Sequence, residues 1–161
     1  MSKADIIEDV RAARAQLEQA IAGLTEDQML QVGAAGIWSV KDVLAHLVAW
    51  EAELVTTLSR LEQHKRYPPR IVDIEDIDEW NEEQYRINAP RPLDIVLEDF
   101  HGVHKHLIAV LETLDRRTLE DNRLWPWMEG EPLSYLVTET AVWHEEEHAQ
   151  DILAWRENIG V

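Results

Sequence analysis

The sequence predicts an all-α fold, in which one domain, residues 1–161, forms a four-helix bundle. Four long segments carry apolar residues at helical spacing, and no segment between them shows the alternation typical of a strand. Glycine and proline are scarce, with six of each, while leucine, alanine and glutamate are abundant, which favours helix over sheet. With 45 % apolar residues and seven tryptophans, the chain can fill the core of such a bundle.

Two of the long helices lie in the N-terminal part. The first runs from about Lys3 to Leu24, and Thr25-Glu26-Asp27-Gln28, which has the form of a capping box, predicts a short helical turn after it. The stretch "VGAAG", Val32 to Gly36, interrupts the helical pattern. The second long helix begins at Ser39, with Asp42 three residues on, and runs to about Gln63.

The third long helix runs from about Arg91 to Leu114, and the fourth from about Leu133 to Arg156. Pro68-Pro69 stops any helix after the second, and "DIDEWNEEQYRI", about Asp76 to Ile87, predicts a short one. Because antiparallel neighbours need far fewer residues than the connection 64–90 provides, we expect this connection to cross the length of the bundle.

Charge and composition limit the partners. The chain has 32 acidic and 15 basic residues, a formal charge of −17, which repels phosphate, so neither nucleic acid nor an anionic membrane is an expected partner. No apolar run is long enough to cross a bilayer, and the charged N-terminus "MSKADIIEDV" does not resemble a signal peptide. The absence of cysteine excludes disulfides and thiolate ligands and fits a cytoplasmic protein.

The stretch "WHEEEH", residues 143–148, carries two histidines four residues apart. At about 100° per residue, His144 and His148 fall within the apolar sector of the fourth helix and are predicted to point into the bundle. The glutamates between them are predicted to lie mainly on the surface. The members of this sector are Leu133, Val137, Thr140, Ala141, His144, His148, Ile152 and Trp155.

Two inward imidazoles so close together have two explanations. Each ring can hydrogen-bond to a core carboxylate or carbonyl, or both can bind one cation. His46 adds a third ring, because it lies seven residues after Ser39, while His148 lies about eight residues before the end of its helix. If these helices are antiparallel, both rings lie about 10–12 Å from the same end of the bundle. This matching favours a metal site formed by His46, His144 and His148.

Other polar residues also fall on apolar stripes. Glu51 lies in the middle of the second helix's stripe, where a carboxylate is costly unless paired. We predict that Glu51 acts as a hydrogen-bond acceptor behind the ligands or as a general base; a stem that only reaches out to water is the alternative. His104 lies mid-stripe on the third helix, either as a fourth ligand or, more simply, as a core histidine. His64, His101 and His106 are predicted to be exposed or peripheral.

The letters of the zinc-peptidase motif H-E-x-x-H also match, through His144, Glu145 and His148. Its extended form fails, because Asp151 occupies the glycine position and only thirteen residues follow His148. In a helix so rich in glutamate the short motif is weak, which argues against a peptidase.

Two stretches, "GIWSVKDVLAHLVAWE" (Gly36 to Glu51) and "WHEEEHAQDILAW" (143–155), resemble signatures of the DinB/YfiT-like superfamily, and the order of the helices fits over essentially the whole chain. The resemblance implies a bundle of up-down-down-up type. It implies a site for nickel or zinc carried by His46, His144 and His148, often in a homodimer. Some members are thiol-dependent transferases that use a low-molecular-weight thiol such as bacillithiol or mycothiol, and others resemble hydrolases.

A third stretch, "DEWNEEQYRI" (Asp78 to Ile87), is similar to a Trp-Asn segment in the ClbS/DfsB-like branch of the same fold. Members of that branch can lack the histidines and act without metal on electrophilic small molecules. This chain has all three histidines, which favours the metal-bearing branch. The alternative for Trp80 and Asn81 is that they anchor the long connection.

These observations lead to one hypothesis and two alternatives. The hypothesis is a metal-dependent enzyme that acts on an electrophilic small molecule by thiol transfer or hydrolysis, in a pocket walled by Trp50 and Trp143. Ordinary core packing is the alternative for these tryptophans. The competing functions are a metal-free protein that binds a small molecule or confers self-resistance, and a purely structural dimeric bundle.

Overall fold

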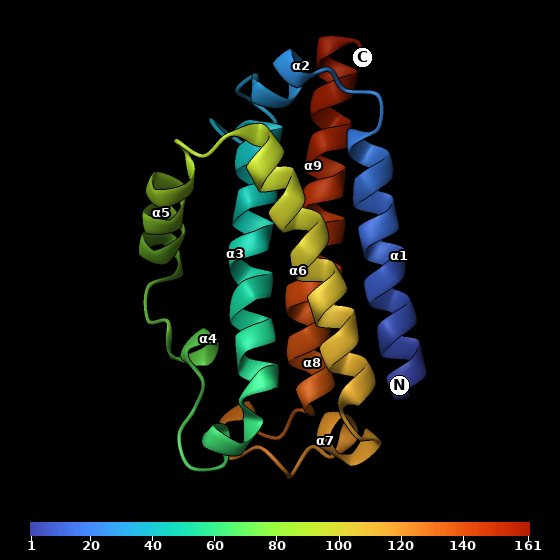
Figure 1. Ribbon diagram of the computed structural model, residues 1–161, viewed down its shortest axis with the longest axis vertical. Coiled ribbons are helices and arrows are strands. Elements are labelled where there is room, and N and C mark those ends of the chain that lie inside the picture. The colour runs from blue at the N-terminus through green and yellow to red at the C-terminus, as the bar shows by residue number, and fades with distance from the viewer.

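The computed structural model describes residues 1–161 and places them in a bundle of four long helices. In Figure 1, α1 rises from the N-terminus, α3 and α6 both descend, and the last helix rises to the C-terminus, so the up-down-down-up topology is confirmed. The last helix has three parts, because a π-helical turn, η3, separates α8 from α9. The long elements are α1 (Lys3–Ile21), α3 (Val40–Ser59), α6 (Leu93–Thr113), α8 (Leu133–Thr138), η3 (Glu139–Trp143) and α9 (His144–Ile159).

Short helices form the connections between the long ones. The second long helix ends earlier than predicted, at Ser59, and a 3₁₀ turn covers the rest of the predicted range. The connection between α3 and α6 crosses the length of the bundle, as predicted, and α5 lies along the outside of α3 (Figure 1). These elements are α2 (Glu26–Leu30), η1 (Leu61–Lys65), α4 (Arg70–Asp73), α5 (Ile77–Asn88), α7 (Arg116–Glu120) and η2 (Pro126–Met128).

The cap predicted at the start of α3 is present and fixes where this helix begins. The Ser39 hydroxyl accepts a hydrogen bond from the Asp42 backbone N–H at 3.2 Å, and the Asp42 carboxylate accepts one from the Ser39 N–H at 3.0 Å. This capping box satisfies two amide groups that the first turn leaves free. His46, seven residues later, therefore has a fixed depth in the bundle.

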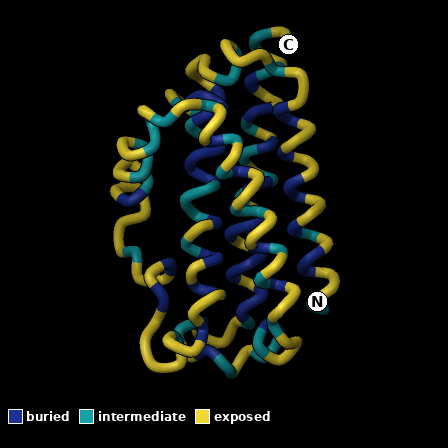
Figure 2. Tube along the Cα trace, viewed as in Figure 1, coloured by how far each residue is buried: buried dark blue, intermediate teal, exposed yellow.

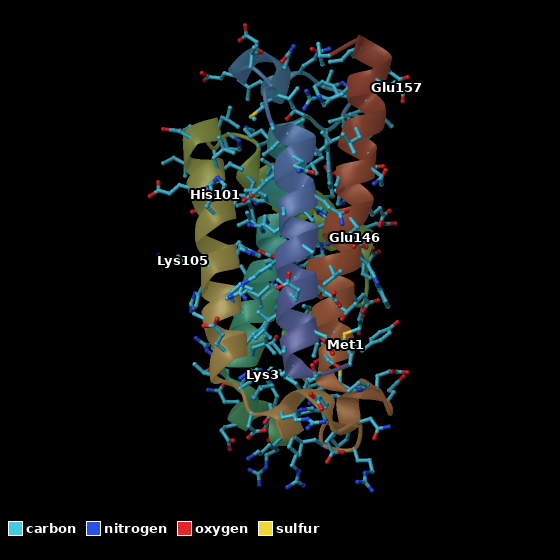
Figure 3. All side chains as sticks on the ribbon, turned by 90° about the vertical axis from the view of Figure 1, so that its right-hand side faces the viewer. Met1, Lys3, His101, Lys105, Glu146 and Glu157 are labelled. Atoms are coloured by element: carbon cyan, nitrogen blue, oxygen red, sulfur yellow. The ribbon has the colours of Figure 1, made fainter.

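The apolar core consists of two clusters, one toward each end of the bundle, and buried positions face the interior along all four helices (Figure 2). The outward faces are exposed, and Figure 3 shows the labelled His101 and Lys105 on the outside of α6. No helix combines the length and the hydropathy that crossing a bilayer requires.

A buried polar layer lies between the two apolar clusters. Arg14 of α1 donates to Glu51 of α3 at 3.0 Å, to Glu145 of α9 at 2.6 Å, and to the backbone carbonyl of Phe100 in α6 at 2.7 Å. The guanidinium also lies over the Phe100 ring, 3.8 Å from its centroid. One side chain thus contacts all three other long helices and ties their relative depths together.

The burial of Glu145 corrects the prediction that the glutamates between the two histidines lie mainly on the surface, because this side chain is 0 % exposed. The reason is the π-helical turn η3, which holds more residues per turn than an α-helix. Residues after it are rotated relative to a continuous α-helix, so Glu145 joins the buried stripe of Ala141 and Ala149. His144 and His148 move to the edge of that stripe and are half-buried.

We expect Arg14→Met to destabilise the protein strongly, by about 3–5 kcal/mol, because it leaves two buried carboxyl groups without their cation. The free energy of unfolding from urea titration at pH 7 measures this loss. Arg11→Met is the matched control on the same helix: Arg11 is half-exposed and pairs only with Glu112, so the same substitution there changes stability little. Equal effects of the two substitutions would contradict the structural role of the polar layer.

Candidate metal centre

Three histidine side chains from two antiparallel helices meet on one side of the bundle. His46 comes from α3, and His144 and His148 from successive turns at the start of α9. Their centroids are 4.7 Å apart for His46 and His144, 5.1 Å for His46 and His148, and 4.9 Å for His144 and His148. The structure therefore brings together the three rings that the sequence predicted to meet.

The nitrogens of this triad are close enough to share one cation. One ring nitrogen from each histidine lies within 4.8 Å of the others, and the Nε2 atoms of His46 and His144 are 2.8 Å apart. Two nitrogens bound to one zinc ion at about 2.0–2.1 Å each are separated by roughly 3.4 Å in tetrahedral geometry. A small movement of the rings is enough to reach this spacing, so the donor set fits a divalent metal.

The protonation of His46 and His144 also suits a cation. Burial, followed by the neighbouring imidazoles, lowers the pKa of His46 to about 3, and burial with His148 lowers that of His144 to about 4. At neutral pH both rings are uncharged, and each keeps a lone pair that can bind a metal.

The third ring has a partner behind it. His148 Nδ1 lies 3.1 Å from the Asp151 carboxylate, three residues along α9, which leaves Nε2 for a ligand. A carboxylate behind a histidine in this way is the arrangement that orients metal ligands in proteins. Asp151 was not among the predicted site residues, although its spacing of three residues from His148 was a usable signal.

Next to the triad is a cavity of about 370 Å³ between α3, the long connection and the last helix. His46 and His144 line it, as do Trp50 and Trp143, the tryptophans predicted to wall a pocket. Trp143 is 49 % exposed, so core packing does not account for this side chain.

The long connection closes one side of the cavity. Trp80 of α5 is buried against Trp50, with ring centroids 4.4 Å apart, as expected of an anchor. Asn81 accepts a hydrogen bond from Trp50 Nε1 at 2.9 Å and also lines the cavity. The Trp-Asn pair thus both anchors the connection and contributes a polar group to the site.

Glu51 does not line this cavity; it lies in the buried polar layer with Arg14 and Glu145 and is 0 % exposed. Its stem therefore does not reach water. Burial and the Glu145 carboxyl raise the pKa of Glu51 to about 8, against the lowering effect of Arg14. Arg14 was not predicted as the partner of Glu51, although it lies between Val10 and Leu17 on the apolar stripe of its own helix.

The remaining histidines lie elsewhere. His104 is half-buried on α6, its Nδ1 has no hydrogen-bond partner, and it is not part of the triad, so the structure does not make it a fourth ligand. His101 and His106 are exposed, and His64 lies near one end of the bundle beside Tyr67, as predicted for peripheral residues.

A four-helix bundle with a three-histidine site at a cavity defines a class of small helical proteins able to hold a metal ion. The family model of the DinB superfamily matches residues 9–152, and the chain belongs to this superfamily. The resemblance found in the sequence is therefore confirmed. No curated protein sequence is detectably similar to this chain.

Solved structures share the fold at low sequence identity. An uncharacterised protein from Escherichia coli UTI89 has a TM-score of 0.82 at 12 % identity, over 99 % of this chain and 95 % of that one. The Sibling Lethal Factor precursor DfsB has a TM-score of 0.82 at 13 % identity, over 99 % of this chain and 97 % of that one. The colibactin self-resistance protein ClbS, solved in complex with a dsDNA, has a TM-score of 0.78 at 13 % identity, over 97 % of this chain and 96 % of that one.

The buried layer predicts a pH dependence of the metal-free protein. Glu51 keeps its proton in the folded state up to about pH 8 but loses it near pH 4.5 when unfolded, so stability falls as pH rises through this window. The lowered pKa values of His46 and His144 act in the opposite sense, and only below their unfolded value of 6.5. Between pH 6.5 and 8 we therefore expect urea denaturation of chelator-treated protein to show decreasing stability.

Glu51→Gln removes the titrating group while keeping its size, and should flatten this decrease. Glu62→Gln, at an exposed position on η1, is the control and should leave the decrease as in the wild type. A wild-type stability that rises or stays level from pH 6.5 to 8 would show that Glu51 does not hold its proton in the folded state.

Proposed function

We propose that this member of the DinB superfamily is a metal-dependent enzyme that acts on an electrophilic small molecule by thiol transfer or hydrolysis. The observation that carries the proposal is that His46 and His144, two of the three candidate ligands, line the cavity beside the triad. A metal held by the triad and a substrate held by the cavity would therefore be neighbours.

Each residue has a distinct part in this proposal. His46, His144 and His148 hold the cation, and imidazole donors suit either nickel or zinc. When bound, such a cation makes water or a thiol a better nucleophile near neutral pH. Trp50 and Trp143 wall the cavity and limit its water.

The polar groups divide between the cavity and the core. Asn81 and Thr140 line the cavity and can orient a substrate by hydrogen bonds. We assign Glu51 the role of the carboxyl group that holds α3 to α1 through Arg14, because a general base would have to reach the cavity. Since the chain has no cysteine, a thiol cosubstrate has to be a separate low-molecular-weight molecule.

A second candidate function is metal-free binding of a small molecule, as in a self-resistance protein. Its support is the fold shared with ClbS and DfsB and the position of Asn81, from the Trp-Asn segment, in the cavity wall. ClbS was solved with dsDNA, but the charge of −17 on this chain opposes a phosphate backbone. We therefore propose a small-molecule substrate and neither nucleic acid nor a membrane as a partner. A homodimer, which the family resemblance implies, and a cytoplasmic location are further parts of the proposal.

The metal content of protein purified without a histidine tag tests the first part of the proposal. We expect about one nickel or zinc ion per chain by mass spectrometry of the element, and almost none in His148→Ala, because two imidazoles bind far more weakly than three. His104→Ala removes a histidine outside the triad and should keep the metal. Equal metal content in wild type and His148→Ala would end the metal-dependent proposal in favour of the metal-free one.

The catalytic part needs a reaction that consumes an electrophile. With 1-chloro-2,4-dinitrobenzene as the probe and 2-mercaptoethanol as the thiol, we expect metal-loaded protein to accelerate product formation, followed by absorbance. Chelator and His144→Ala should each abolish this acceleration, and His104→Ala should preserve it. An acceleration that survives in chelator and in His144→Ala would contradict a reaction at the triad.

A further inference from the structure

We infer that the substrate bound in the cavity beside the triad carries a positive charge, and that Glu139 and Glu147 select it. The inference deepens the proposed function, on which it rests for placing a substrate in this cavity. Its evidence is the charge of the cavity wall and the side chains between which a ligand would lie.

The cavity wall contains carboxylates and no permanently cationic side chain. Glu139 and Glu147 line it, and none of the other lining residues is lysine or arginine. Both glutamates are exposed, and neither side chain has an ion-pair or hydrogen-bond partner in the protein. Arg70, next in sequence to the lining residue Ile71, instead lies 3.7 Å from Glu53. Two carboxylates with no counter-ion face the space that a ligand would occupy.

The helical spacing explains how the two carboxylates reach one ligand. Glu139, Trp143 and Glu147 are four residues apart and lie on one edge of the last helix, so the indole of Trp143 is between the two carboxylates along the helix. Trp50 lies on the opposite helix, α3, and lines the same cavity. Both kinds of side chain favour an ammonium group, since the carboxylates attract it by charge and the indole rings attract it through their π faces.

The interior of the cavity indicates the rest of the ligand. Ile71, Ile77 and Leu136 contribute an apolar surface, which suits an aliphatic or aromatic body. His46 lines the cavity, is 8 % exposed, and has a buried Nδ1 without a hydrogen-bond partner. Because that nitrogen is inaccessible to solvent, the polar groups that the cavity itself presents are the side chains of Asn81 and Thr140, together with the two glutamates. A small aromatic or aliphatic amine fits this wall, whereas a carboxylated substrate or thiol meets repulsion.

The glutamates have one other use that must be separated from substrate selection. A divalent metal held by three neutral imidazoles keeps two positive charges, which Glu139 and Glu147 would also stabilise. If that is their role, replacing them weakens metal binding and leaves the preference for ligand charge unchanged. The test therefore measures ligand affinity in both metal-free and metal-loaded protein.

The experiment compares three probes of similar size and different charge: 2-phenylethylammonium, 2-phenylethanol and 3-phenylpropanoate. We expect calorimetry at low ionic strength to give the highest affinity for the ammonium probe and the lowest for the carboxylate. In the double variant Glu139→Gln, Glu147→Gln, the affinity for the ammonium probe should fall about five- to tenfold, with the neutral probe changed less than about twofold. Added salt should weaken only the charged probes.

The matched control is Glu146→Gln, Glu157→Gln, which removes the same charge from α9 at positions outside the cavity, both labelled in Figure 3. It should leave all three affinities nearly unchanged. Equal affinities for the three probes, no measurable binding of the ammonium probe, or an equal loss in the control would overturn the inference. Because metal-free protein is included, the two proposals can fail separately. A preference for the ammonium probe without bound metal would contradict only the metal site, and bound metal without this preference would contradict only the role of the glutamates.

Discussion

The relative positions of the four long helices depend on the pairing of one buried charge, the guanidinium of Arg14. The Arg14 guanidinium has left water, and its donors are satisfied only when Glu51, Glu145 and the Phe100 carbonyl, one from each of the other three long helices, lie at the same depth. Burial and the Glu145 carboxyl raise the pKa of Glu51 to about 8, and burial raises the pKa of Glu145 as well, which reduces the negative charge that the layer has to hold. Sliding one helix along its axis would leave a buried charge unpaired. The layer therefore fixes the depth of α9 against α3, and with it the depth of His144 against His46.

The π-helical turn η3 lets one helix satisfy two demands. Below it, Leu133 and Val137 fill the lower apolar cluster; above it, Glu145 must reach Arg14 while His144 and His148 face α3. The rotation introduced by the turn meets both conditions. The same turn carries Glu139 and Thr140 into the cavity wall. The irregular turn of the helix therefore lies at the candidate functional site, as π-helical turns often do.

Much of the fold could be predicted, because the relevant signals are local. Ser39 and Asp42 form the predicted cap. The rings of His46 and His148 meet as predicted, although α9 runs to Ile159, three residues beyond the predicted end. Glu145 was misplaced because the helical wheel assumed 100° per residue across η3. The role of Arg14 and the cavity could not be predicted from local patterns, because they depend on side chains from separate helices and on where the long connection packs.

The function proposed for this chain requires that the three imidazoles bind one divalent metal ion. Anomalous X-ray diffraction from crystals of untagged protein, collected on both sides of the nickel and zinc absorption edges, tests it most directly. We expect a single anomalous peak within about 2.0–2.3 Å of a nitrogen of each of His46, His144 and His148. Density for the three rings with no peak between them, or a peak at the acidic surface instead, would contradict it.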